Sequence, residues 1–276
     1  SVDTDWNKAN NWTPSGIPTS SDCVIIPVTA NNPIISGSGY NGLAGTLSVY
    51  NGASLTINSN NSLTVTSWVN IQPTGNFTIN NNSSLVQISG SANTGNITYK
   101  RNASVRNQDF VYWASPVSSF SAGSISTPLN PAGIYTWNTT VANPNGGQGN
   151  WQTFSGAMIP GKGYIMRAPS SFSYATPATW TATFTGVANN GSISVPIFRG
   201  SDTNVSPHYG VNGTQIDNYS DNWNLLGNPY PSAVRASQFL FDNRTKIMNA
   251  ACANRNVIIH LFRMERSLSL YEISVS

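Results

Sequence analysis

Residues 45–91 read GTLSVYNGASLTINSNNSLTVTSWVNIQPTGNFTINNNSSLVQISGS, and the spacing of apolar residues in this stretch decides the fold. Short runs of alternating apolar and polar residues are separated by Asn-Gly, Asn-rich or Pro-Thr-Gly segments. The first apolar residues of successive runs lie 8, 8, 6, 8 and 8 positions apart. These leading residues are Leu47, Leu55, Leu63, Val69, Phe77 and Leu85.

Alternation with a period of two, interrupted by turn residues, predicts short half-buried strands. The regular spacing indicates the stacked coils of a β-solenoid, in which each unit buries its apolar row only against its neighbours. A meander of tight hairpins would produce a similar pattern. On the solenoid interpretation, we expect the six leading residues to form one buried column, with the Asn-rich turns outside.

The composition indicates an all-β protein with a polar but weakly charged surface. Of the 276 residues, 39% are hydrophobic and only 8% are charged, far below the usual quarter. Asn, Ser, Thr and Gly supply the polarity, which suits extracellular β proteins. Glu is absent before Glu265, and strong helix formers are scarce before residue 235, so helices are expected to be minor.

The charge distribution argues against a nucleic-acid partner. Bases and acids balance over residues 1–234, and the excess behind the net charge of +3 lies in residues 235–276. A nucleic-acid footprint would need basic residues clustered on the folded body. No apolar run approaches the ~18 residues of a membrane span. Cys23 and Cys252 fit no metal or redox spacing. They could pair with each other, but we expect each to be a small buried hydrophobe.

The regular spacing of short apolar runs ends near residue 100, and we therefore expect the chain to have three parts. Residues 1–98 form a β-solenoid-like domain, residues 99–245 a β-sandwich-like or barrel-like domain, and residues 246–276 an atypical tail that can add a closing strand over 257–262. The second domain is expected to contain strands at 133–138, 151–154, 163–168, 179–186 and 192–198.

Two sequence motifs resemble those of a known family. The opening has Trp6, Trp12, Pro18 and Asp22, and Val-Ile-Ile-Pro stands at 24–27. Residues 222–232 read NWNLLGNPYPS. Both resemble Bacteroidetes-type secreted and surface β proteins that are exported by the type IX secretion system. The phrases YWASP at 112–116 and MIPGKGY at 158–164 resemble further motifs of these proteins.

The resemblance implies export and an extracellular or outer-cell-surface location, but no single activity. The family's usual terminal sorting domain is absent, and the sequence after about residue 247 departs from the pattern. We therefore expect the chain to be part of a longer polypeptide, and the segment after residue 247 not to be the ancestral continuation.

Catalytic groups are scarce. The two histidines are His208 and His260, and no Gly-x-Ser-x-Gly elbow accompanies them. Glycoside hydrolysis needs two carboxylates across a cleft, and the near pairs are those that Asp217 makes with Asp202 or Asp221, which also fit turns. No phosphate-cradling or dinucleotide motif is present. We therefore favour a protein that is not an enzyme and has no cofactor.

Calcium is the metal that two stretches could hold. Asp217, Asn218 and Asp221 could ligate Ca²⁺, although their setting also fits turns. Asp3 and Asp5 begin a second pattern at calcium-like spacing, but it lacks the glycine and distal glutamate of an EF-hand loop. For this second pattern we expect the carboxylates to cap a local turn.

Aromatic residues supply the candidate ligand site. Tyr135, Trp137 and Trp151 flank a long Asn/Gly loop. Sugars bind flat ring faces beside amide groups, whereas the alternative is that both tryptophans belong to the core. In the 222–232 motif we expect a closing strand, a rigid Pro-containing turn, and Ser232 as the N-cap of a helix beginning near Ala236.

These observations predict a secreted or cell-surface non-enzymatic β protein, acting as an adhesin or scaffold. The alternative is a polysaccharide-binding or polysaccharide-processing module. The expected partners are polysaccharides or other cell-surface components.

Overall fold

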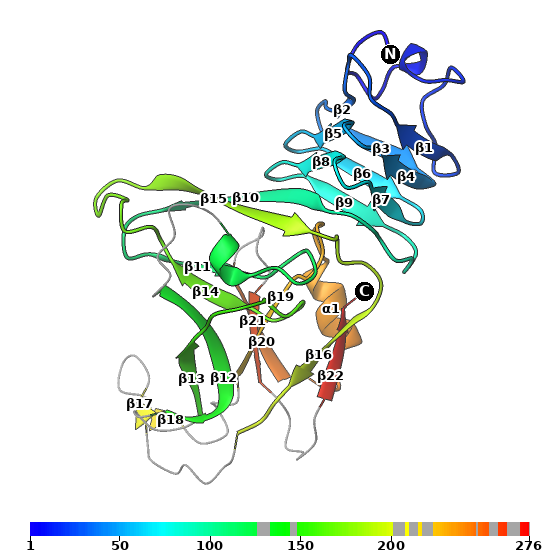
Figure 1. Ribbon diagram of the computed structural model, residues 1–276. Helices are drawn as coiled ribbons and strands as arrows, with labels where there is room; N and C mark the ends of the chain where they lie inside the picture. The colour runs from blue at the N-terminus through cyan, green and yellow to red at the C-terminus, as the bar shows by residue number, and fades with distance from the viewer. Residues whose placement is uncertain are drawn as a thin grey trace.

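The structure is a computed structural model of the chain. It describes residues 1–125, 133–143, 148–200 and 223–246, and in addition the backbone of five strands at 208–209, 215–216, 248–253, 259–263 and 271–275. Within this part the chain is nearly all β, as the composition predicts. A parallel β-solenoid is followed by a separate region of antiparallel sheets (Figure 1).

The solenoid has three parallel sheets, and each coil adds one strand to each sheet. The first sheet contains β1 (Cys23–Ile26), β4 (Thr46–Val49) and β7 (Val69–Ile71). The second begins with β2 (Ile34–Ile35), β5 (Ser54–Ile57) and β8 (Asn76–Ile79). The third contains β3 (Asn41–Ala44), β6 (Ser62–Val65) and β9 (Ser84–Gln87). The solenoid prediction is confirmed, and the hairpin meander is excluded.

The prediction of one buried column is wrong, although all six leading residues are buried. They stack in pairs on three different sheets, and the pairs are Leu47 with Val69, Leu55 with Phe77, and Leu63 with Leu85. Each has at most 2% of its surface exposed. The reason is geometric, because one coil consists of three runs. The interior is therefore one core lined from three sides.

The N-terminal segment covers the first coil. The main-chain N–H of Trp6 donates to the carbonyl of Ile34 at 3.2 Å, and the N–H of Ile34 donates to the carbonyl of Thr4 at 2.7 Å. Trp6 is fully buried, and the ring of Trp12 meets it edge-on with centroids 4.8 Å apart. A short 3₁₀ helix, η1 (Ala9–Asn11), lies between the two tryptophans. The paired tryptophans thus close the apolar interior, which would otherwise end in water.

The long strand β10 (Ile97–Val105) joins the solenoid to the rest of the chain. It pairs in parallel with β8 through Thr98 and Tyr99, and along its whole length in antiparallel fashion with β15 (Ala178–Gly186). Residues 98 and 99 therefore lie inside a strand that both regions share.

Arg101 covers the turn that follows β8 in the last coil of the solenoid. Its guanidinium donates to the carbonyls of Asn80 at 3.1 Å and Ser83 at 2.6 Å, and lies over the ring of Tyr99. Burial lowers the pKa of Arg101 to about 10. The cation satisfies turn carbonyls that a further coil would otherwise cover.

A four-stranded antiparallel sheet forms the centre of the second region. Its order is β11 (Phe110–Trp113), β14 (Tyr164–Arg167), β12 (Ile134–Ala142), β13 (Gln148–Thr153). One face packs into the core through Trp113, Ile134, Tyr164 and Met166, all buried. Together with β15 and β16 (Ile193–Ile197), these strands confirm the five strands expected between residues 133 and 198.

The remaining elements close the second region. A three-stranded sheet has the order β19 (Trp223–Gly227), β21 (Ile259–Arg263), β20 (Met248–Ala253). The segment expected to form a strand at 257–262 contains β21, which is the central strand of this sheet rather than a strand at its edge. Two more pairs join β16 with β22 (Tyr271–Val275) and β17 (His208–Tyr209) with β18 (Gln215–Ile216). The helical elements here are η2 (Ala122–Ser124) and α1 (Ala236–Asp242).

Two further sequence expectations can be compared with the described residues. Cys23 is exposed, so its expected burial is wrong, because it lies on the outward-facing side of β1. No helix among the described residues has the length and apolar character that a membrane crossing requires.

Candidate functional site

The outer face of the four-stranded antiparallel sheet gathers aromatic side chains. Because residues alternate between the faces of a strand, the burial of Trp113 and Ile134 places their neighbours on the outer face. The register aligns Tyr112 with Ile165 and Tyr135 across three strands, and Trp137 with Trp151. We call this set the aromatic face, and its members are Phe110, Tyr112, Tyr135, Trp137 and Trp151.

The aromatic face brings together the three residues predicted from sequence and adds two. Phe110 and Tyr112 come from β11, which lies two strands away from β12 in the sheet. The alternation in the run FVYW at 110–113 is the signal that could have pointed to them, since Trp113 is the member that faces the core.

Trp137 is fixed by its surroundings. Its indole N–H donates to the carbonyl of Trp223 at 2.8 Å, and the hydroxyl of Thr139 donates to the same oxygen at 2.6 Å. Gly149 has φ +95, and a Cβ there would lie 2.3 Å from the Trp137 ring, so the indole packs directly on the backbone. The ring of Trp151 meets Trp137 edge-on at 5.1 Å. Trp137 therefore has a structural role, and Trp151 stands half-buried beside it.

The opposite end of the aromatic face is open. Phe110 has 45% of its surface exposed, and its ring centroid lies 6.1 Å from that of Tyr135. The guanidinium carbon of Arg167 lies 6.0 Å from the Phe110 centroid. Gly133 is next to Arg167, and a Cβ at Gly133 would come within 2.5 Å of the Arg167 Cβ. The rings of Phe110 and Tyr135 and the guanidinium of Arg167 therefore lie together at this end of the aromatic face.

Of the two candidate calcium-binding stretches, the structure describes only the N-terminal one. Asp217, Asn218 and Asp221 lie outside the described residues. In the N-terminal pattern, Asp3 accepts hydrogen bonds from the main-chain N–H of Asp5 at 3.0 Å and from the Asn11 side chain at 2.6 Å. Asp5 in turn accepts from the N–H of Asn7 at 2.9 Å. These carboxylates cap a turn, as expected. The described residues contain no group of three or more His, Cys, Asp or Glu that could hold a metal.

The electrostatics of the N-terminal turn follow from one ion pair. The ammonium of Lys8 lies 2.5 Å from the carboxylate of Asp3. Hydrogen bonds from Lys8 and then from Asn11 lower the pKa of Asp3 from 3.8 to about 2. The ion pair is solvent-exposed and therefore contributes little to stability.

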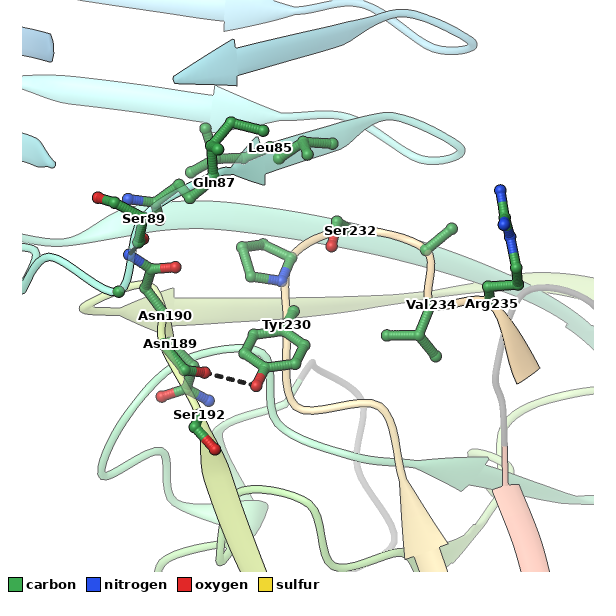
Figure 2. Close-up of a pocket in the computed structure, with 16 residues that line it drawn as sticks. Leu85, Gln87, Ser89, Asn189, Asn190, Ser192, Tyr230, Ser232, Val234 and Arg235 are labelled. Atoms are coloured by element: carbon green, nitrogen blue, oxygen red, sulfur yellow. Dashed lines mark hydrogen bonds between the residues drawn. The ribbon is translucent and has the colours of Figure 1, made fainter. Parts of the chain in front are cut away.

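The motif at 222–232 connects the two regions of the protein. Leu225 and Leu226 of β19 are buried, as expected for a closing strand, and Gly227 ends that strand. The hydroxyl of Tyr230 donates to the carbonyl of Gly191 at 2.6 Å, and Figure 2 shows this ring directed at segment 189–192.

The expected role of Ser232 as a helix N-cap is wrong. The helix α1 begins at Ala236, its N-cap position is Arg235, and no side chain caps it. The carbonyl of Ser232 instead accepts a hydrogen bond from the side chain of Asn228. The turn after Pro231 is therefore closed locally, and the helix starts further along the chain.

Comparison with known proteins places the chain in a family. No curated protein and no solved structure matches it. One family model matches residues 1–260, and it is described as a domain of unknown function, DUF8693. Because the match covers the solenoid and most of the antiparallel region, the chain belongs to the DUF8693 family.

Proposed function

We propose that this protein is a non-enzymatic, secreted or cell-surface β protein that binds polysaccharide through its aromatic face. The observation that carries the proposal is the open end of that face, where Phe110 and Tyr135 lie beside the guanidinium of Arg167. Sugar rings stack their C–H faces on aromatic rings and present hydroxyls at the rim.

The carboxylates near the aromatic face can be followed only among the described residues. Glycoside hydrolysis uses two carboxylates on either side of the scissile bond. Among the residues of the second region whose side chains the structure describes, the acids are Asp109 and Asp242. Asp109 accepts a hydrogen bond from the main-chain N–H of Arg106 at 2.7 Å and so serves its own turn. No carboxylate pair therefore stands at the aromatic face among these residues.

The location outside the cell rests on the sequence. The low charge content and the motifs at 6–27 and 222–232 support export by the type IX route. In this proposal the solenoid serves as a rigid spacer, since its coils contact only their neighbours. Fractionation of the source organism tests the location, and a protein found only inside the cell would contradict it.

The binding experiment uses affinity electrophoresis and calorimetry with a panel of soluble polysaccharides. Loss of one stacked ring costs roughly 1 kcal/mol, so Phe110→Ala and Trp151→Ala should each weaken binding about fivefold. The matched control is Tyr50→Ala, which removes an exposed ring (40% exposed) from the solenoid. A wild-type protein that binds nothing in the panel, or ring variants that bind like the wild type, would refute the proposal.

The same samples test the alternative of a polysaccharide-processing enzyme. Reducing ends are measured after long incubation of each polysaccharide with the pure chain. Release of reducing ends that survives repurification would favour the processing module and overturn the non-enzymatic assignment.

A further inference from the structure

A cavity of about 390 Å³ lies between the end of the solenoid and the turn at 228–232. Figure 2 shows β9 above it, segment 189–192 on one side and the turn containing Tyr230 on the other. The other two solenoid sheets continue past the last full coil, one through β10 and the other through the bridge between Asn70 and Thr94. Among the described strands, none follows β9 in the third sheet, and the cavity occupies part of the position that a further strand would take.

The strand β9 presents free main-chain groups to this cavity. The N–H groups of Ser84 and Ile88 point back to the preceding coil, where they donate to Asn61 and Val65. By the alternation of a parallel ladder, the main-chain groups of Leu85 and Gln87 point to the open side. The N–H of Leu85 donates to Pro231. Both main-chain groups of Gln87, which is half-buried, have no partner among the described residues.

The walls around these groups combine apolar and polar side chains with one aromatic ring. The ring of Tyr230 lines the cavity while its hydroxyl is held by Gly191. Asn190 is anchored by its amide, which donates to the carbonyls of Ser89 and Ser91 at 2.8 Å each. Ser192 is exposed on the same wall. Fixed donors and acceptors beside one ring form a typical site for a small polar ligand.

The charge among the residues that line the cavity is positive. Arg235 is the one charged side chain among the residues that line the cavity. It is exposed and has no hydrogen-bond or ion-pair partner among the described residues. A guanidinium recognises a carboxylate through two parallel hydrogen bonds.

We propose that this cavity binds a single sugar residue that bears a carboxylate, a hexuronic acid unit of a polysaccharide. The sugar hydroxyls pair with the free main-chain groups of Gln87, the ring lies against Tyr230, and the carboxylate pairs with Arg235. A peptide strand fits less well, because Pro231 occupies the first position along β9 and leaves fewer residues open than a strand needs. The site is separate from the aromatic face and does not depend on it.

The test titrates labelled protein with methyl glucuronide, methyl galacturonide and the matching neutral glycosides, followed by amide NMR shifts and calorimetry. We expect saturable shifts at the amides of Gln87 and Ser192, and tenfold weaker binding of the neutral sugars. Arg235→Ala should remove that preference, whereas Arg244→Ala, which removes an exposed arginine after the same helix, should keep it. Ser192→Phe, at an exposed position, should fill the cavity and abolish binding with an unchanged melting temperature.

Three results would overturn this proposal. These are an absence of shifts at Gln87 with every sugar, uronide binding by Arg235→Ala at the wild-type affinity, and saturable binding of extended peptides at β9 in place of sugars. Trp151→Ala separates the two sites, since it weakens polysaccharide binding at the aromatic face and should leave uronide binding unchanged.

Discussion

The main-chain N–H of Leu85, on the last strand of a solenoid sheet, donates to the carbonyl of Pro231 at 2.8 Å. The same turn is held from its other side by Asn189, whose side-chain amide donates to the carbonyls of Pro229 at 2.8 Å and Ser115 at 3.2 Å. The turn at 229–231 is therefore hydrogen-bonded both to the solenoid and to the antiparallel region. The Pro-containing turn acts as a structural clasp between the two regions.

Asn189→Ala should destabilise the protein by about 1–3 kcal/mol, because it leaves buried carbonyls without a donor. Asn189 is only 9% exposed, so water cannot easily replace the lost amide. Urea denaturation followed by circular dichroism measures the change. The control is Asn102→Ala, an exposed asparagine on β10. Equal midpoints for the two variants would mean that the clasp contributes nothing to stability.

Leu63→Ala should cost ~2–5 kcal/mol, as large-to-small changes in a packed core do. Leu63 is fully buried and stacks on Leu85 in the next coil, so its removal leaves a void inside the solenoid. Thr56→Ala on the outward side of β5 is the control and should stay within about 0.5 kcal/mol of wild type. A small loss for Leu63→Ala would show that the three sheets do not share one core.

The sequence predicts the strands of the solenoid well but not their arrangement in space. Alternation identifies which side chains face inward, and Leu47 and Leu55 are both buried as expected. It does not state how many strands make a coil, and this number decides which residues stack. The clue was the shorter step from Leu63 to Val69, because the 8, 8, 6 pattern then begins again. Residues 22 apart, such as Ser54 and Asn76, are therefore the true neighbours.

The candidate site shows the same division between local and long-range information. Trp137 and Trp151 lie on adjacent antiparallel strands, and the loop between them signals that pairing. Phe110 and Arg167 reach the site through the order β11-β14-β12, which depends on long-range pairing that no local pattern encodes. The Ser232 prediction failed because α1 begins at Ala236 with Arg235 in the N-cap position, whereas the Ser232 carbonyl belongs to the turn that Asn228 closes.

The ion pair between Lys8 and Asp3 predicts a pH response. Because the folded-state pKa of Asp3 is lowered from 3.8 to about 2, the charged carboxylate favours the folded turn above the unfolded pKa. That contribution should be lost as the pH falls from about 4 toward 2. An NMR titration of the Asp3 carboxyl carbon should give a pKa near 2.

Lys8→Met should raise the pKa of Asp3, because the hydrogen bond from Lys8 is the largest cause of its shift. Asp22 is an internal control. Its pKa is lowered by hydrogen bonds from Thr19 and should not respond to the change at Lys8. If Asp3 titrates near 3.8 in the wild type, the ion pair does not form in solution.

Gly95 and Gly39 offer a matched test of the packing where the solenoid meets the second region. Their φ angles are +74 and +73, so alanine at either position costs the ~1–2 kcal/mol of a left-handed backbone. Their surroundings differ, since a Cβ at Gly95 would lie 1.7 Å from the carbonyl oxygen of Ile71, whereas nothing lies within 4 Å at Gly39. The Ile71 carbonyl belongs to the strand β7 and cannot swing away as a flexible side chain could.

Gly95→Ala should therefore cost a further ~1–3 kcal/mol beyond Gly39→Ala, as overpacking does. The difference should appear in urea midpoints, since both variants share the same conformational cost. The clash must also disturb the neighbouring residue Thr94, whose N–H and carbonyl bond to Val69 and to Ile71 at 2.9 Å each. Amide exchange at Thr94 should accelerate in Gly95→Ala and remain slow in Gly39→Ala. Equal costs and equal exchange in the two variants would mean that the chain at Gly95 does not pack against the last coil.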